Sequence, residues 1–287
     1  MTYLRDEIAS QPSVWERALA VSADALPGAG ERVAVIGCGT SYYMAQAYAA
    51  LREAAGHGET DAFAASEFPA ARRYDRVVAL TRSGTTTEVL AALERTTVPS
   101  VAVTADPATP ISSAADAVVA LEFADEKSVV QTRFATAALV LLRASVGERL
   151  SGLSAAATAE LATPLPRELL AAEQWTFLGT GWTIGLANEA ALKLREATQS
   201  WTESYYAMEY RHGPISIAAP GRVVWVFGAA PAGLADEVRR TGAHVELFDG
   251  DPLVSLVRAH RVAEAVAEAR GLDPDRPRNL DRSVILT

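Results

Sequence analysis

Apolar and polar positions along the chain follow two alternating patterns. Short apolar runs of five or six residues are bounded by glycine, proline or polar residues, and between them apolar positions recur at helical spacing. These patterns predict strands at 32–36, 76–80, 100–104 and 117–122, and helices up to about residue 25 and at 42–55, 87–95 and 130–146. Buried strands that alternate with helices are typical of a parallel sheet covered on both faces. We therefore expect an α/β fold.

A segment without any strand pattern, residues 147–174, follows this first unit and contains Pro164 and Pro166. Beyond it the alternation of strand and helix begins again. A length of 287 residues also fits two domains, at about 150 residues per domain. We therefore expect one subdomain over residues 1–150 and a second, with a C-terminal tail, over 151–287.

The two halves share an ordered series of residues, which indicates a duplication. A shift of 142 residues superposes Gly37 on Gly179 and Gly39 on Gly181. Further matches are Glu67-Phe68 with Glu209-Tyr210 and, after four more residues of offset, Arg76-Val77-Val78 with Arg222-Val223-Val224. Copies of this length are tandem domains and not the units of a solenoid, which span about 20–50 residues.

Composition narrows the classes of partner. Lys and Arg total 26 against 35 Asp and Glu, and the net charge of −9 disfavours nucleic acid and anionic membranes as partners. The single cysteine, Cys38, excludes an internal disulfide or a cysteine-built zinc site and fits a reducing compartment. The first residues lack the basic end and apolar run of a signal peptide, and apolar stretches such as 134–142 are too short to span a bilayer. We expect a cytoplasmic protein.

The loop at 37–41 joins a predicted strand to a helix. This geometry directs backbone N–H groups and the positive end of the helix at an anion. A dinucleotide site needs a third glycine, but Tyr42 occupies that position, so an NAD site is only weakly indicated. A tight turn is the simpler interpretation, although the hydroxyls of Thr40 and Ser41 favour a ligand contact. Cys38, between two glycines, is interpreted as a small loop residue.

The loop at 81–87 indicates a ligand site more specifically than the loop at 37–41 does. It carries four threonines, Ser83, Gly84 and Arg82 between a strand and a helix, at the edge where open α/β sheets bind ligands. Hydroxyls and backbone N–H groups suit a phosphate monoester. One hydroxyl among residues 85–87 is expected to cap the helix, whatever the function of the loop. Residues 81–87 carry five hydroxyl groups, more than a cap needs.

Two further groups are candidates for acid–base chemistry. Lys193 and Glu196 are three positions apart on a predicted helix and share one face, for which a solvated ion pair is the favoured interpretation. His212 precedes Gly213-Pro214 and therefore lies in a turn; an acid–base role for it is plausible but undecided. The four histidines show no metal-ligand spacing, so no metal site is expected.

Together these segments resemble the sugar isomerase (SIS) family, and most closely the isomerase half of its glucosamine-6-phosphate synthase branch. The matching segments, in chain order, are Glu7-Ile8 with Gln11-Pro12, then residues 37–42, 65–68, 81–86, 126–133, 189–196 with Glu203, 209–214 and 275–280. Such an ordered set is far more specific than any single loop. The resemblance implies two tandem SIS-type subdomains, each a flavodoxin-like αβα sandwich, and phosphorylated sugars as the substrate class.

The resemblance also implies a role for each matching residue. Glu196 would be the base that moves a proton between C1 and C2, Lys193 would lie beside it, and His212 of a neighbouring subunit would assist ring opening. The residues implied to hold the phosphate and nearby hydroxyls are Thr40, Ser41, Thr81, Arg82, Ser83 and Thr86, and those implied to line the sugar are Glu126 and Val129. A histidine from the partner implies an obligate homodimer with its active site at the subunit interface. No cofactor is implied.

The chain departs from the family at two points. The family's glutaminase domain has no counterpart in these 287 residues, so no ammonia source is expected. Where the family's tail carries a lysine, this chain has Arg282, whose guanidinium stays protonated and forms no sugar imine. We therefore expect a stand-alone phosphosugar isomerase or amino-sugar-phosphate deaminase, with Arg282 as an electrostatic or phosphate contact, and not glutamine-dependent synthesis. The alternative is a non-catalytic sugar-phosphate sensor, although a sensor has no need of Glu196.

Overall fold

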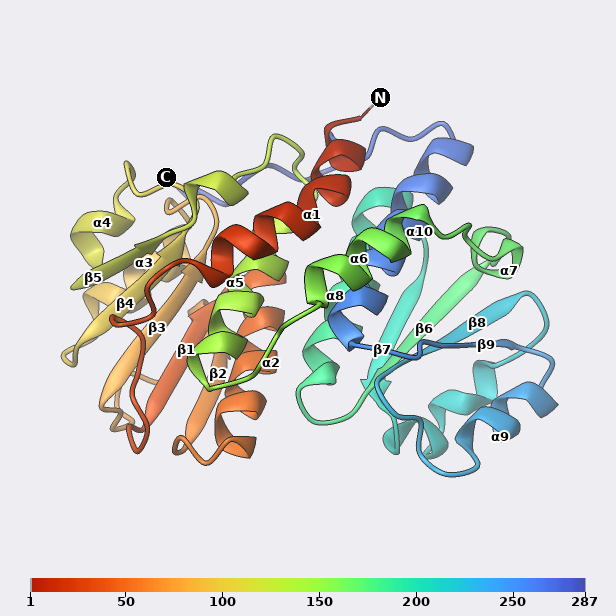
Figure 1. Cartoon of the computed structure of the whole chain (residues 1–287), viewed down its shortest axis with the longest axis horizontal. Helices are drawn as coiled ribbons and strands as arrows, with labels where there is room; N and C mark the ends of the chain where they lie inside the picture. The colour runs from red at the N-terminus through yellow and green to blue at the C-terminus, as the bar shows by residue number, and fades with distance from the viewer. Residues whose placement is uncertain (1, 287) are drawn as a thin grey trace.

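The computed structural model describes residues 2–286, which form two parallel sheets with helices between and outside them (Figure 1). The first sheet has the strand order β2-β1-β3-β4-β5 and the second the order β7-β6-β8-β9. The strands are β1 (Val33–Gly37), β2 (Thr60–Ala64), β3 (Arg76–Thr81), β4 (Ser100–Thr104), β5 (Ala117–Ala120), β6 (Gln174–Gly179), β7 (Thr202–Tyr206), β8 (Arg222–Phe227) and β9 (His244–Leu247). The α/β class predicted from the sequence is confirmed.

The helices form an inner layer between the sheets and thinner outer layers (Figure 1). The inner helices are α1 (Tyr3–Leu19), α2 (Thr40–Ala54), α5 (Arg133–Ser145), α6 (Leu153–Ala162), α8 (Thr183–Thr198) and α10 (Pro252–Ala269). The other helices are α3 (Thr87–Glu94), α4 (Ile111–Ala114), α7 (Arg167–Leu170) and α9 (Leu234–Arg240), and short 3₁₀ turns lie at Ala65–Glu67, Glu122–Ala124, Glu209–Arg211 and Pro214–Ile217. One large apolar core fills the space between the sheets, and a smaller core lies on each outer face. None of the described helices is long and apolar enough to cross a membrane.

The two sheets repeat one topology, as the duplication predicts. Strands β1 to β4 correspond to β6 to β9 in their order, and β5 extends the first sheet only. The register follows the same offset of 142 residues, because Val33 pairs with Thr60 and Trp175 pairs with Thr202. The duplication is therefore preserved in the backbone hydrogen bonds and not only in scattered glycines.

The third strand of each repeat differs from the sequence alignment by one residue. Val33 pairs with Arg76, whereas Trp175 pairs with Val223, so the offset there is 147 residues and not 146. Successive side chains of a strand point to opposite faces, and the sequence alignment placed Val77 and Val223 on the same face. In the structure Val77 packs in the outer core of its sheet, whereas Val223 packs in the core between the sheets.

Glycines at the end of the first strand of each repeat allow the next helix to begin close to the sheet. A Cβ at Gly37 would lie 2.7 Å from the backbone carbonyl carbon of Ser41, which no side chain tolerates. Gly39 and Gly181 occupy equivalent turns and have φ angles of 53° and 56°, in the left-handed region that favours glycine. The matching glycines in the sequence therefore mark the same turn in both halves.

The segment between the repeats, residues 147–174, contains the helices α6 and α7. It contains α6, whose Glu160 carboxylate lies 2.7 Å from Arg258 and 3.2 Å from Arg261 on α10. Leu153 and Ala157 of α6 are buried in the core between the sheets. This segment thus contributes to the core as well as joining the repeats, and the division into residues 1–150 and 151–287 stays a prediction.

The C-terminal tail, assigned to the second half from the sequence, lies against the first half. The carboxylate of Asp275 accepts hydrogen bonds from the N–H groups of Tyr3 (2.7 Å) and Leu4 (2.8 Å) at the start of α1. Its carbonyl accepts a further bond from the Val129 N–H at 3.1 Å. The tail therefore returns to the loops that follow the first sheet.

Candidate active site

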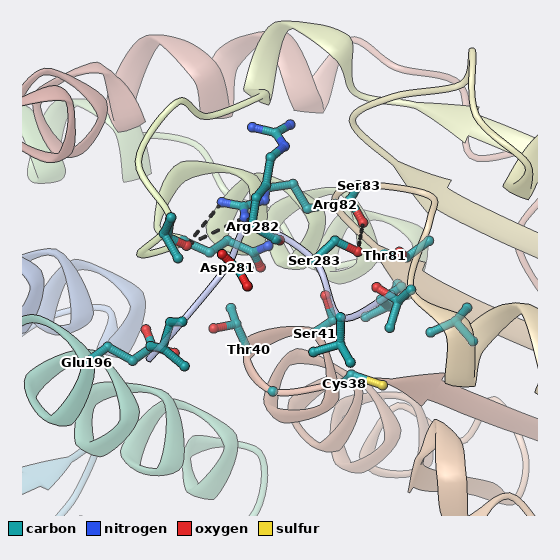
Figure 2. A pocket seen from close by; sticks show the side chains of 18 of the residues that line it. Cys38, Thr40, Ser41, Thr81, Arg82, Ser83, Glu196, Asp281, Arg282 and Ser283 are labelled. Atoms are coloured by element: carbon teal, nitrogen blue, oxygen red, sulfur yellow. Dashed lines mark hydrogen bonds between the residues drawn. The ribbon is translucent and has the colours of Figure 1, made fainter. Parts of the chain in front are cut away.

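A pocket opens where the loops after β1 and β3 meet α8 and the tail (Figure 2). It lies at the carboxyl edge of the first sheet, where ligands of open α/β sheets bind. It is lined by Cys38, Gly39, Thr40, Ser41, Leu80, Thr81, Arg82, Ser83, Thr86, Val89, Val129, Gln131, Lys193, Glu196, Leu280, Asp281, Arg282, Ser283 and Val284. Among the residues singled out from the sequence, all except Glu126 and His212 line this pocket.

The loop between β3 and α3 presents hydroxyl groups to the pocket. Gly84 has a φ of 64°, and a Cβ there would lie 2.0 Å from Thr109 Oγ1, so the turn requires glycine. Thr86 is the residue before α3, but its side chain makes no capping hydrogen bond. The capping expected from the sequence therefore does not use this hydroxyl, which remains available to a ligand in the pocket.

The tail contacts the same loop. Ser283 Oγ lies 3.1 Å from Ser83 Oγ and 2.9 Å from Thr85 Oγ1. The carbonyl of Val284 accepts a hydrogen bond from the Thr87 N–H, the first of α3, at 3.2 Å. The tail thus covers part of the hydroxyl-rich loop and adds one hydroxyl to it.

The first turn of α2 forms the opposite wall. Thr40 and Ser41 are both buried, and Figure 2 shows Ser41 facing the strand-to-helix loop that carries Ser83. Burial, with a smaller contribution from Glu88, raises the pKa of the neighbouring Cys38 thiol to about 11. Cys38 is therefore a neutral thiol at neutral pH, in keeping with its interpretation as a small loop residue.

Arg82 lines the pocket, but its guanidinium is directed away from a ligand. It donates to the backbone carbonyls of Ser128 (3.1 Å), Val129 (3.5 Å) and Arg282 (3.0 Å), and it lies 3.8 Å from the carboxylate of Glu126. Only 4% of Arg82 is exposed. In this structure the residue joins the loop at 128–129 to the tail, a role that differs from the phosphate contact expected from the resemblance.

Arg282 and Glu126 are also engaged outside the sugar space. The Arg282 guanidinium bonds to the carboxylate of Asp125 and the carbonyl of Glu126, and Figure 2 shows it directed away from the pocket. The Glu126 carboxylate accepts hydrogen bonds from the N–H groups of Thr132 (2.5 Å) and Arg133 (2.8 Å), at the start of α5. Glu126 therefore caps α5 and is not among the residues that line the pocket. The contact with the sugar that the resemblance implied for it stays a prediction.

Lys193 and Glu196 form a buried pair, so the interpretation as a solvated ion pair was wrong. Lys193 is 1% exposed, and its Nζ lies 2.5 Å from Glu196 Oε2 and 3.6 Å from Glu189 Oε1. Helix α8 lies between the two sheets and packs on α2 and α10, and this packing buries the Lys193 side chain. The Glu196 side chain retains 18% exposure, directed into the pocket. Burial opposes the charge on Lys193, but the two carboxylates together raise its pKa, and it stays protonated.

Glu189 was not assigned a role from the sequence. It is completely buried, neither carboxylate oxygen has a hydrogen-bond partner among the described residues, and burial raises its pKa to about 8 against the opposing effect of Lys193. Glu189 precedes Lys193 by four residues in an alanine-rich helix, and this spacing could have indicated that the two side chains lie next to each other.

Glu7 on α1 was also missed as a site residue. Its Oε1 accepts hydrogen bonds from the N–H groups of Lys127 (2.5 Å) and Ser128 (3.4 Å), which precede the pocket residue Val129. Burial, and then the charge of Glu126, raise the pKa of Glu7 to about 7. Its position on the helix face that buries Leu4 and Ile8 was the signal that its carboxylate is internal.

His212 lies outside the pocket of its own chain. It is exposed and follows the 3₁₀ turn Glu209–Arg211 after β7. Large apolar side chains are exposed on β7 and the loops beside it: Trp201 (78%), Tyr206 and Met208. Within one chain, the structure does not bring His212 together with Glu196.

The second repeat has no equivalent pocket chemistry. Thr183 corresponds to Ser41, but its Oγ1 is engaged with the N–H and carbonyl of Thr180 and the carbonyl of Phe227. The loop after β8 reads Gly228-Ala229-Ala230-Pro231 and carries no hydroxyl. No cluster of three or more potential metal ligands was found within residues 2–286. Of the loops that follow the third strand of each repeat, the one in the first repeat is therefore rich in hydroxyls and the one in the second repeat is not.

Residues 28–146 match the family model of the SIS domain, so this part of the chain is a SIS domain. The chain is similar to glutamine–fructose-6-phosphate aminotransferases (isomerizing). Identity is 29% with that of Gloeobacter violaceus, over 88% of this chain and 52% of the relative, and 27% with that of Caulobacter vibrioides, over 98% and 58%. The chain thus spans about half the length of the curated relatives it matches.

Solved structures share the whole fold. Glucosamine-6-phosphate deaminase from Thermotoga maritima superposes with a TM-score of 0.80 at 23% identity, covering 99% of this chain and 100% of that one. Tagatose-6-phosphate ketose/aldose isomerase from Escherichia coli gives a TM-score of 0.83 at 20% identity, covering 100% and 96%. These similarities confirm the fold of two tandem SIS units that the sequence predicted.

Proposed function

We propose that the protein is a phosphosugar isomerase or an amino-sugar-phosphate deaminase-isomerase that acts on a hexose 6-phosphate. The observation that carries the proposal is the convergence of two unlike groups in one pocket. The hydroxyl-rich loop before α3 lies at one end, and the Glu196 carboxylate, paired with Lys193, lines the same space. The names of the solved structures that share the fold, a deaminase and a ketose/aldose isomerase of sugar phosphates, support the same chemistry.

In this proposal the phosphate binds to Ser83, Thr86 and Ser41, with the N-terminal end of α3 behind it. The sugar then extends toward α8, where Glu196 transfers a proton between C1 and C2. Proton transfer beside a carbonyl needs a carboxylate held next to the carbon and a positive group near the enediolate oxygens. Lys193 supplies that positive group, because it stays protonated between the carboxylates of α8.

The contacts and chemistry of Arg282 argue against one reaction, the transfer of nitrogen from glutamine to the sugar. Its guanidinium is engaged by Asp125 and by the carbonyl of Glu126, and a guanidinium is a poor nucleophile at neutral pH. We therefore do not propose glutamine-dependent amino-sugar synthesis, which the sequence analysis disfavoured.

The test is an assay of the purified protein against a panel of hexose 6-phosphates and amino-hexose 6-phosphates. The double variant Ser83→Ala, Thr86→Ala should bind the substrate of the panel at least about 10-fold more weakly, because each lost hydroxyl removes a charge-assisted hydrogen bond to phosphate. Thr97→Ala, an exposed threonine beyond the far end of α3, is the matched control and should bind normally. Equal affinity of the double variant would refute the phosphate assignment. Binding of several sugar phosphates without turnover of any would favour the sensor.

We also propose that two subunits complete the site, with His212 entering the pocket of the partner. The exposed position of His212, which follows the exposed side chains of Tyr206 and Met208 after β7, supports this, because exposed large apolar side chains that lie together often mark a contact surface. In a symmetric dimer the same surface patch serves both subunits.

Subunit complementation tests this arrangement. Co-expression of Glu196→Gln and His212→Ala subunits, each with its own tag, gives a heterodimer with one intact site and one doubly altered site. Random pairing should therefore restore about one quarter of the wild-type activity, although each variant alone is nearly inactive. A purified heterodimer that carries both tags and shows no recovered activity would contradict a shared site.

A further inference from the structure

Asp281 is a pocket residue that no step of the proposed reaction has used. Asp281 lies on the tail. Figure 2 shows its carboxylate between the hydroxyl-rich loop and Glu196. No hydrogen bond or ion pair engages this carboxylate within residues 2–286. Its charge is therefore available to a ligand.

The tail around Asp281 is held in place on one side by several bonds. The carbonyl of Arg282 accepts a hydrogen bond from Arg82 at 3.0 Å, and Ser283 Oγ lies 3.1 Å from Ser83 Oγ. These contacts fix the backbone immediately after Asp281 to the phosphate loop. The position of its carboxylate over the pocket follows from this attachment and does not depend on a free chain end.

The cations near the sugar end are already compensated. Lys193 lies between Glu189 and Glu196, at 3.6 and 2.5 Å from their oxygens. Arg282 is paired with Asp125, and Arg82 donates to backbone carbonyls and faces the Glu126 carboxylate. Asp281 thus adds a negative charge that no side chain of the pocket neutralises, between the hydroxyl-rich loop and Glu196.

A ligand that matches this charge pattern is an anion at one end and a cation at the other. Hydroxyls and backbone N–H groups of the loop suit the phosphate, whereas a free carboxylate suits a protonated amine, to which it accepts a charge-assisted hydrogen bond. A hydroxyl in the place of the amine gives only an ordinary hydrogen bond and leaves the carboxylate charge without a partner.

We propose that Asp281 is a specificity residue that recognises an ammonium group, and that the substrate class is therefore the amino-hexose phosphates and not the uncharged hexose phosphates. This inference rests on the proposed function, since it assumes that a sugar phosphate binds in this pocket. It narrows the reaction to one that begins or ends with a free amino group on the sugar.

The experiment compares the affinities of three probes: glucosamine 6-phosphate, its N-acetyl derivative and glucose 6-phosphate. Affinity is measured by calorimetry in the full chain carrying Glu196→Gln, which prevents turnover, with and without Asp281→Asn. The amino ester should bind about 10- to 100-fold more tightly than the other two, the value of one charge-assisted hydrogen bond. Asp281→Asn should reduce this preference to within about 3-fold, with the affinity for glucose 6-phosphate unchanged.

Asp24→Asn, a change of an exposed carboxylate before β1, controls for net charge and should leave the preference intact. If the esters bind through the Ser83 and Thr86 loop but without preference for the amine, the inference fails while the proposed function stands. A preference that survives Asp281→Asn also overturns the inference. If none of the esters binds, the proposed function fails and this inference with it.

Discussion

Glu196→Gln should lower the turnover number of the sugar-phosphate reaction by about 10²- to 10⁴-fold, the usual contribution of a general base. The amide keeps the shape and volume of the side chain, so the pocket and the fold should persist. Affinity for the substrate should change little, since the proposed phosphate site lies at the other end of the pocket. Steady-state kinetics should therefore show the loss in kcat and not in KM.

Glu94→Gln is the matched control for this substitution. Glu94 is exposed at the end of α3 and has no ion pair within the described residues, so its turnover should equal that of the wild type. Solvent-derived deuterium at C2 of the recovered substrate should appear with the wild type and disappear with Glu196→Gln. Wild-type turnover by the Glu196→Gln protein would remove Glu196 from the reaction.

Lys193→Met should lower the free energy of unfolding at neutral pH by about 3–5 kcal/mol, the usual cost of removing one partner from a buried ion pair. Lys193 is 1% exposed and faces two carboxylates, one of them completely buried. Methionine fills much of the same volume but leaves Glu196 without its cation and removes the positive charge that opposes the raised pKa of Glu189. Denaturant unfolding at pH 7 measures the loss, and Lys127→Met, at an exposed lysine, should cost less than about 0.5 kcal/mol.

The pH dependence of this loss has a defined sign. The pKa of Glu189 in the folded protein, about 8, lies above its value in the unfolded chain. Its contribution to stability is therefore fully present below the unfolded pKa, near 4.5, and is lost as pH rises through 8. Without Lys193 this dependence should become steeper, so the deficit of Lys193→Met should be smaller at pH 5 than at pH 8. Addition of Glu189→Gln should restore part of the stability, and a deficit equal at both pH values would refute the electrostatic explanation.

The strands could be predicted because their signal is local. Residues 76–80 and 100–104 are apolar runs between turn-forming residues, and β3 and β4 occupy them almost residue for residue. The alignment of β3 with β8 was one residue off because both read Arg-Val-Val. In a strand buried on both faces, no polar position marks which face each residue takes.

The sequence predicted most of the residues that line the pocket, but it did not predict the directions in which their side chains point. A loop position places a backbone at the sheet edge, but whether Arg82 or Arg282 turns toward a ligand depends on which carbonyls and carboxylates the tail brings beside it. The burial of Lys193 likewise depends on two sheets enclosing α8, and nothing in a spacing of three residues reports this. Glu126 was assigned to the sugar by resemblance, and its capping of α5 is visible only once that helix begins at Arg133.

The return of the tail to the first repeat has a consequence for biosynthesis. Residues 280–284 close the pocket, yet the loops they cover belong to a sheet whose strands end at Ala120. On the ribosome the first sheet leaves the exit tunnel while the tail is still unmade, and domains fold in that order. The hydroxyl-rich loop is therefore synthesised before Ser283 and Asp281, and it stays uncovered until the tail has been made.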